Sequence, residues 1–190
     1  MTIKKIYLDI DITLADTATY ALKWHDHPDY YQDSKNHGIY STHDLAGMGW
    51  REFWSELPTD FWASVPKLPW ADFLIQASID AVGEENVYLL TSPIDTPNCY
   101  YGKHLWVLSN MPNFIRRLII TPAKEACVGA DGLLIDDAEH NQHSFDAAGK
   151  SGNFWLMPSL SNRKSDLALN LYKYPEIISD VVKILTTGVV

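Results

Sequence analysis

Five short apolar segments, separated by intervals that can each hold a helix, constrain the fold of this chain most. They are residues 3–10, 86–91, 116–121, 131–136 and 153–157. Most are rich in β-branched or aromatic residues and end in a polar or Pro/Gly-containing turn, which is typical of buried strands. Helices are expected at residues 69–82, 97–110, 138–148 and 175–187. This alternation predicts an α/β fold with a Rossmann-like parallel sheet flanked by helices.

The interval of residues 15–66 breaks the alternation. It contains no strong buried strand, and its aromatic residues cluster at 50–54 and 61–65. We therefore expect a small, mainly helical cap at residues 15–66, inserted after the first strand. Residues 1–14 and 67–190 would form the core, and no repeat or linker indicates a second independent domain.

Charge and hydropathy exclude several classes of partner. The net charge of −9 opposes non-specific binding to nucleic acid polymers and to anionic membranes. The longest apolar stretches are too short to span a bilayer, and the amino-terminal residues lack the features of a signal peptide. The two cysteines have neither disulfide-framework nor zinc-site spacing. We expect a cytoplasmic protein that acts on a small molecule; the oligomeric state stays open, with a homodimer among the alternatives.

Polar side chains follow four of the expected strands. They are Asp9, Asp11, Thr91, Ser92, Lys124, Asp136 and Asp137. Because ligands of open parallel sheets bind beyond the carboxyl ends of the strands, we expect these residues to converge. The crowded carboxylates would repel one another unless a divalent cation compensates them, and all-oxygen ligation favours Mg²⁺. With a lysine beside it, such a site predicts phosphoryl transfer.

Asp9 and Asp11 offer the two functions that phosphoester hydrolysis needs. One carboxylate can attack phosphorus to form an aspartyl-phosphate, which divides the reaction into two easier displacements. The other can protonate the leaving alcohol and then activate water. The spacing alone does not say which residue does which.

Each motif also has a purely structural interpretation. Asp9 and Asp11 could be turn residues that end a strand. Thr91 and Ser92 could cap the following helix, a role compatible with binding phosphate through the same N–H groups. Taken by itself, Lys103 would be a solvated surface lysine.

The segments YLDIDITLADT, LLTSP and LLIDD, in this order and with a lysine before the last, resemble the four motifs of haloacid dehalogenase-superfamily phosphatases. More narrowly, residues 87–140 resemble the 5′(3′)-deoxyribonucleotidase family. The resemblance implies that Asp9 is the nucleophile, Asp11 the general acid/base, and Lys124 a stabiliser of the transferring phosphoryl group. It also implies an Mg²⁺ site formed by Asp9, the Asp11 backbone carbonyl, Asp136 and Asp137.

The same resemblance implies a deoxyribonucleoside 5′(3′)-monophosphate as substrate. Thr91 and Ser92 would hold the phosphate, and Lys103 matches a family lysine with a supporting role. Family members bind the nucleobase against aromatic residues of the cap, which points to Trp50 and Phe61 here. Aromatic residues in so small a cap are otherwise expected to form its core.

The chain departs from the family pattern in ways that keep alternatives open. Ile12 and Gly102 stand where the family has a glycine and an acidic residue, and Thr17 stands where an aromatic pocket residue is expected. One alternative is a related phosphatase for another small phosphoester. The other is a catalytically silent module that binds a nucleotide or a metal, if the bulk of Ile12 misplaces Asp11.

Overall fold

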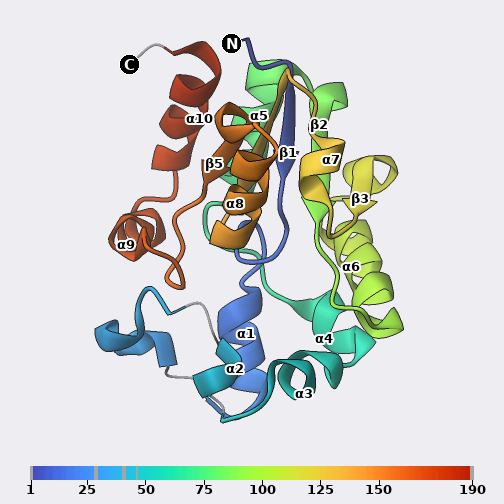
Figure 1. Ribbon diagram of the computed structural model, residues 1–190, viewed down its shortest axis with the longest axis vertical. Coiled ribbons are helices and arrows are strands. Elements are labelled where there is room, and N and C mark those ends of the chain that lie inside the picture. Colours follow the sequence, from blue (N-terminus) through green and yellow to red (C-terminus); the bar gives the residue numbers. More distant parts are fainter. Residues whose placement is uncertain (1, 28–29, 40–41, 46, 189–190) are drawn as a thin grey trace.

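A five-stranded parallel sheet organises the protein, as a computed structural model of residues 2–27, 30–39, 42–45 and 47–188 shows (Figure 1). The strands are β1 (Lys5–Leu8), β2 (Val87–Thr91), β3 (Leu118–Ile120), β4 (Gly132–Asp136) and β5 (Phe154–Leu156). The helices are α1 (Thr17–Trp24), α2 (Thr42–Leu45), α3 (Trp50–Ser55), α4 (Thr59–Ser64), α5 (Ala71–Val82), α6 (Pro97–Asn110), α7 (Lys124–Cys127), α8 (Glu139–Ala147), α9 (Ser165–Lys173) and α10 (Ile177–Thr187). All five expected strands are therefore confirmed, within a few residues at each end.

The strand order β3-β2-β1-β4-β5 places β1 at the centre of the sheet. Ile6 of β1 pairs with Val87 of β2 on one side and with Leu133 of β4 on the other. The chain moves outward from β1 through β2 to β3, and β4 then returns to the free side of β1. A crevice beyond the strand ends is expected at such a change of direction, between β1 and β4.

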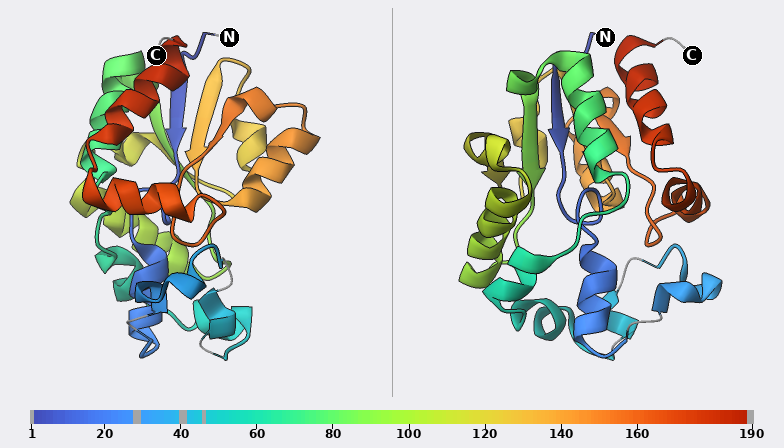
Figure 2. Two further views of the ribbon diagram at one scale, coloured as in Figure 1. Left: turned by 90° about the vertical axis from the view of Figure 1, so that its left-hand side faces the viewer. Right: turned by 180° about the vertical axis from the view of Figure 1, so that it is seen from behind.

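Helices cover both faces of the sheet (Figure 2, where α5 is green, α10 red, and α7 and α8 yellow to orange), so the inner strands are largely buried, whereas the edge strand β3 is half-buried. Successive side chains of β1 alternate between the faces. Ile6 and Leu8 belong to the larger core cluster, which includes residues of α5, α6 and α10. Tyr7 belongs to a smaller cluster together with Phe145 of α8. The α/β architecture with a flanked parallel sheet is thus as predicted.

The four expected helices are present as α5, α6, α8 and α10, but α9 has no counterpart among the sequence expectations. Its apolar residues Leu167, Leu169 and Leu171 alternate with a period of two, which is typical of a strand rather than a helix. Only Ala168 and Leu171 of this helix are buried. These two buried residues are three positions apart, as expected for one face of a helix.

Residues 15–66, here called the inserted segment, lie beyond the carboxyl ends of the strands and contain α1 to α4 (Figure 1). The two ends of the segment lie side by side. Ala15 and Lys67 form an isolated β-bridge, and the backbone N–H of Asp16 donates to the carbonyl of Pro66 at 2.8 Å. Its mainly helical structure is as expected.

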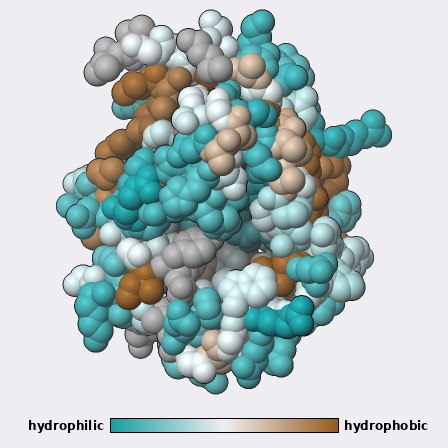
Figure 3. Space-filling model, viewed as in Figure 1, coloured by the Kyte–Doolittle hydropathy of each residue, from teal (hydrophilic) through white to brown (hydrophobic). Residues whose placement is uncertain are grey.

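The outer face of α10 exposes apolar residues, which Figure 3 shows as brown at the upper left. Ile178 and Val182 of this helix are buried, whereas Ile177 and Ile184 are exposed. Among the described residues, no helix is both long and apolar enough to cross a bilayer.

The contact between α4 and α6 explains why Gly102 stands within a helix. A Cβ atom at this position would lie 2.3 Å from Cβ of Trp62 and 2.8 Å from the carbonyl oxygen of Thr59. No larger residue fits without displacing α4. The acidic residue of the family pattern is therefore sterically excluded here.

Replacing Gly102 with alanine is expected to lower the free energy of unfolding by about 1–3 kcal/mol, the usual cost of overpacking a core. Helix propensity alone would raise the free energy of unfolding by about 1 kcal/mol when alanine replaces glycine. Overpacking and helix propensity therefore predict changes of opposite sign. Denaturant unfolding of Gly102→Ala and of the control Gly152→Ala, whose added Cβ meets nothing within 4 Å, measures the difference. A stabilised Gly102→Ala protein would show that α4 does not pack on α6 in this way.

Candidate functional site

A cavity of about 410 Å³ lies where the strand ends meet the inserted segment. The core lines it with residues that follow β1, β2, β3 and β4, and the inserted segment lines it from α1, α2, α3 and α4. The core residues are Asp9, Asp11, Ile12, Ser92, Pro93, Ile94, Lys103, Lys124, Asp137, Ala138, His140 and Asn141. Apart from Thr91, Asp136 and Phe61, every predicted site residue lines this cavity.

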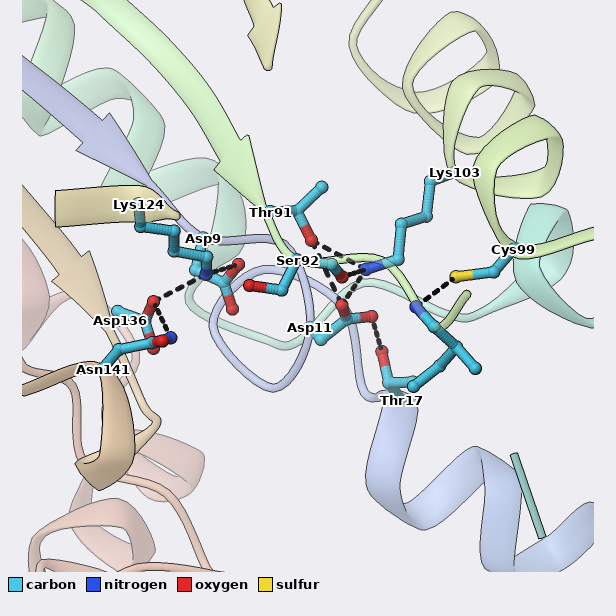
Figure 4. Close-up of polar contacts among 11 residues, drawn as sticks. Asp9, Asp11, Thr17, Thr91, Ser92, Cys99, Lys103, Lys124, Asp136 and Asn141 are labelled. Atoms are coloured by element: carbon cyan, nitrogen blue, oxygen red, sulfur yellow. Dashed lines mark hydrogen bonds and ion pairs between the residues drawn. The ribbon is translucent and has the colours of Figure 1, made fainter. Parts of the chain in front are cut away.

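Lys124 joins two of the predicted carboxylates. Its Nζ lies 2.6 Å from Oδ1 of Asp9 and 2.6 Å from Oδ2 of Asp136, and all three side chains are buried (Figure 4). Asp9 directly follows β1 and Asp136 ends the neighbouring β4, while Lys124 begins α7 shortly after β3. The strand order therefore brings together three residues that are up to 127 positions apart in the sequence.

Neighbouring groups complete the hydrogen bonding of Asp136. The side-chain amide of Asn141, on α8, donates to Oδ2 at 2.9 Å, and the backbone N–H of Ala138 donates to Oδ1 at 2.8 Å. Sequence analysis did not single out Asn141. Its position five residues after Asp136, on the helix that follows the strand, is the signal that could have indicated it.

The carboxylates of Asp9, Asp136 and Asp137 offer oxygen atoms that all lie within 4.8 Å of one another. Oδ2 of Asp137 is buried and has no hydrogen-bond partner among the described residues. An unpartnered buried carboxylate oxygen is costly unless a cation binds it. An all-oxygen, carboxylate-rich set of this kind fits Mg²⁺.

The charges of the cavity point to the same conclusion. Together with Asp11, four carboxylates lie beside two ammonium groups, those of Lys103 and Lys124, in the part of the chain that the structure describes. Burial, together with the nearby carboxylates of Asp136 and Asp11, raises the pKa of Asp9 to about 7 despite the attraction of Lys124. Burial and the Asp136 and Asp9 carboxylates also raise the pKa of Asp137. A divalent cation would match the excess of two negative charges when all four carboxyl groups are ionised.

Asp11 is held from two sides, as Figure 4 shows. Its Oδ2 forms an ion pair with Lys103 and accepts a hydrogen bond from Thr91 Oγ1 at 3.2 Å. Its Oδ1 accepts a hydrogen bond from Thr17 Oγ1 at 2.9 Å. Burial opposes the charge of this carboxylate, but Lys103 and the Thr17 hydroxyl lower the pKa of Asp11 below its ordinary value.

Lys103 is not the surface lysine that its position by itself suggests. Its side chain is 2% exposed, and its Nζ donates to Thr91 Oγ1 and to the Ser92 carbonyl, both at 2.7 Å. The hydroxyl of Thr96 accepts a hydrogen bond from Cys99 N at 3.3 Å at the start of α6, which fixes where this helix begins. Lys103 lies in the second turn of that helix, beside the end of β2.

The two predicted substrate-binding aromatics have different surroundings. Trp50 lines the cavity and is 50% exposed. Phe61, predicted to bind the nucleobase, does not line the cavity: it is 0% exposed, stacks on Tyr20 with ring centroids 5.2 Å apart, and forms a T-shaped contact with Trp24. It forms the core of the inserted segment because a segment of this size needs its own apolar centre.

Other cavity residues were not predicted as site residues. Trp54 and Trp62, whose rings stack with centroids 6.1 Å apart, line the same wall as Trp50. His43 of α2 and His140 of α8 also line the cavity, although sequence analysis gave no functional role to either region. The number of tryptophans in residues 50–62 was the available signal, but periodicity could not tell which of them face inward.

The chain matches no protein-family model, and no curated protein is significantly similar to it. The assignment of a function therefore depends on the residues of the cavity and on the motifs that they form.

The carboxylate cluster predicts how stability changes with pH. In the absence of divalent cations, the free energy of unfolding is expected to fall as the pH rises from the ordinary Asp value of 3.8 to about 7. In this range the folded protein binds more protons than the unfolded chain, because burial raises the pKa of Asp9. Mg²⁺ is expected to oppose the fall, and thermal unfolding across this range with Mg²⁺ or EDTA measures both effects.

Asp137→Asn removes one buried negative charge from the cluster. Above pH ~7 and without Mg²⁺, this variant is expected to be more stable than the wild type, because repulsion within the cluster decreases. It is also expected to lose most of the stabilisation by Mg²⁺. The exposed Asp146→Asn serves as the matched control, and equal stabilisation of all three proteins by Mg²⁺ would place the cation elsewhere.

Proposed function

We propose that this protein is an Mg²⁺-dependent phosphomonoesterase of the haloacid dehalogenase type that hydrolyses deoxyribonucleoside 5′(3′)-monophosphates. The observation that carries the proposal is the buried triad in which Lys124 contacts Asp9 and Asp136 beside the unpartnered Asp137 carboxylate. The second carboxylate needed for two-step hydrolysis, Asp11, lines the same cavity. In this proposal residues 15–66 act as the cap.

The reaction proceeds in two displacements. A carboxylate oxygen of Asp9 attacks phosphorus, and the bond between phosphorus and the alcohol oxygen breaks. Because Lys103 lowers the pKa of Asp11, this carboxylate takes up a proton as the substrate binds and then passes it to the alcohol oxygen. Water then attacks the aspartyl-phosphate and gives a proton to Asp11, which releases inorganic phosphate and restores Asp9. The Nζ of Lys124, 2.6 Å from Asp9, is positioned to stabilise the charge on the transferring phosphoryl group.

Asp9, Asp136, Asp137 and the backbone carbonyl of Asp11 would hold the cation. When bound, Mg²⁺ would neutralise charge on the phosphate and on the carboxylates around it. Ser92 follows β2 and lines the cavity, so its hydroxyl and backbone groups would hold the phosphate. Thr91 is fully buried outside the cavity, where its hydroxyl bonds to Asp11 and Lys103, so it would support the site from behind. Lys103 holds Asp11 and Thr91 in place from α6.

Three tryptophans of the cavity, here called the tryptophan wall, support a leaving alcohol that carries an aromatic ring. Trp50, Trp54 and Trp62 line the cavity from the inserted segment. Indole rings of this kind can stack on a nucleobase while the phosphate lies against the lysines. The net charge of −9 opposes binding of a polynucleotide. A mononucleotide therefore fits the site better as a substrate than the end of a polynucleotide.

A panel of deoxyribo- and ribonucleoside 5′- and 3′-monophosphates, with sugar phosphates as controls, tests the proposal. Phosphate release is expected to require Mg²⁺, to stop with EDTA and to be fastest for deoxyribonucleotides. Asp9→Asn is expected to abolish turnover because an amide cannot act as the nucleophile. Phosphate release and thermal unfolding should be measured together, so that loss of folding is separated from loss of chemistry.

The outcomes of this panel separate the alternatives. Release mainly from non-nucleotides would keep the mechanism but reject the substrate class. Binding of Mg²⁺ and nucleotide without release would favour the silent module, and substantial activity of Asp9→Asn would exclude Asp9 as nucleophile.

Trp50→Ala tests the substrate-binding role of the tryptophan wall. Because the Trp50 side chain is half exposed, its loss is expected to change stability little while raising KM for nucleotides several-fold more than for sugar phosphates. Trp24→Ala is the matched control, since Trp24 is 48% exposed and does not line the cavity. Equal effects of the two substitutions on all substrates would remove Trp50 from the binding site.

A further inference from the structure

Lys124, which lies between Asp9 and Asp136, begins α7, a helix of only four residues (Figure 1). Isolated helices shorter than about 12 residues are marginal in water, because nucleation costs more free energy than a single turn of hydrogen bonds recovers. The place of α7, and of the lysine that begins it, must therefore be fixed by contacts with the rest of the protein.

The amino end of α7 is tied to the sheet. The backbone N–H of Ala123 donates to the Thr121 hydroxyl at 3.1 Å, and the backbone N–H of Thr121 donates to the carbonyl of Thr91 at 2.9 Å. Thr91 is the last residue of β2. The last carbonyl groups of a helix have no partner within it, so the carboxyl end of α7 needs a separate anchor.

Lys150 supplies that anchor. Its Nζ donates to the carbonyl oxygen of Glu125, the second residue of α7, at 2.6 Å, and to that of Val128, which directly follows the helix, at 2.8 Å. An ammonium group at this end of a helix satisfies the carbonyl groups and interacts favourably with the helix dipole. Lys150 is itself fixed, because its backbone N–H donates at 2.8 Å to the carbonyl of Phe145, which is fully buried.

Asn153 holds the next part of the chain independently of Lys150. Its side-chain amide donates at 2.6 Å to the carbonyl oxygen of Gly132, the first residue of β4, and the residue is buried. The start of β4, the strand that ends at Asp136, is therefore anchored without the help of α7. A displacement of α7 would thus move Lys124 relative to Asp136 rather than move the two residues together.

We propose that Lys150 is a positioning residue, which closes the carboxyl end of α7 and thereby holds the Lys124 ammonium group between Asp9 and Asp136. The inference rests on the proposed phosphatase function, in which Lys124 stabilises the transferring phosphoryl group. Without the Lys150 ammonium group, α7 shifts and Lys124 is no longer within hydrogen-bond distance of both carboxylates. Lys150 does not line the cavity, so its loss affects the chemical step more than the binding of substrate.

Steady-state kinetics of Lys150→Met and of the wild-type protein, with a deoxyribonucleoside monophosphate as substrate, test the inference. Methionine keeps an unbranched side chain but removes the ammonium group. We expect kcat and kcat/KM to fall together, about ten- to a hundredfold, because a small displacement of a group that acts in the transition state has effects of this size. KM should change less than about threefold. Lys150→Arg keeps the charge and the hydrogen-bond donors, and is expected to recover most of the activity.

Lys164→Met is the matched control. Lys164 is also half-buried, and its Nζ also donates to a backbone carbonyl, that of Leu156 at the end of β5, at 2.7 Å. Its substitution removes the same kind of contact away from α7 and should leave kcat within about threefold of the wild-type value. Equal losses of kcat in Lys150→Met and Lys164→Met, without recovery in Lys150→Arg, would overturn the inference.

Thermal unfolding of each variant, measured beside its kinetics, separates loss of folding from displacement of Lys124. If Lys150→Met does not fold, Lys150→Gln takes its place, because its neutral amide can still donate to one carbonyl group. The same fall in kcat with an unchanged KM is expected. A rise in KM without a fall in kcat would overturn the inference.

Crystal structures of the wild-type protein and of the folded Lys150 variant give a readout that needs no turnover. In the variant, Lys124 is expected to lose its contact with Asp9 or with Asp136 while Asn153 keeps its hydrogen bond to Gly132. Retention of both Lys124 contacts would overturn the positioning role even if the protein is an active phosphatase. If the wild-type protein releases no phosphate, the proposed function fails, and the same pair of structures still decides whether Lys150 positions Lys124.

Discussion

The ammonium group of Lys124 between Asp9 and Asp136 is the interaction on which the rest of the site depends. All three side chains are buried, and removing one member of such a group would leave uncompensated charge at a cost of about 3–5 kcal/mol. Burial opposes the charge of Lys124, yet Asp136 and Asp9 hold its pKa above the ordinary value. The lysine therefore stays charged and connects the ends of β1, β3 and β4.

One lysine cannot neutralise the whole cluster, and this imbalance gives the cavity its chemistry. Asp137 adds a third carboxylate whose Oδ2 has no partner among the described residues, and burial keeps the pKa of Asp9 raised. A fold selected for stability alone would replace such charges with apolar residues. In the proposed function, a bound divalent cation would compensate the excess of carboxylates.

Sequence alone predicted the sheet and the residues at its strand ends, because buried parallel strands and their polar termini are local patterns. It could not predict that Lys103 is buried, since the partners of this side chain, Asp11 and Thr91, come from distant segments. Phe61 was assigned to the substrate because apolar side chains inside a small segment and on a cavity wall look alike in sequence. The helix α9 was missed because its leucines alternate as in a strand.

Ile12 shows how the chain keeps the loop after β1 without the glycine of the family pattern. Its φ of 59° lies in the left-handed region, which costs a β-branched residue roughly 1–2 kcal/mol. Its backbone N–H donates to the Ala15 carbonyl at 2.7 Å, closing the turn that carries the chain from Asp11 to α1. Its side chain is partly buried against the core, which offsets part of the strain. This turn connects Asp11 to Thr17. Its strained conformation brings the two residues close enough for their hydrogen bond.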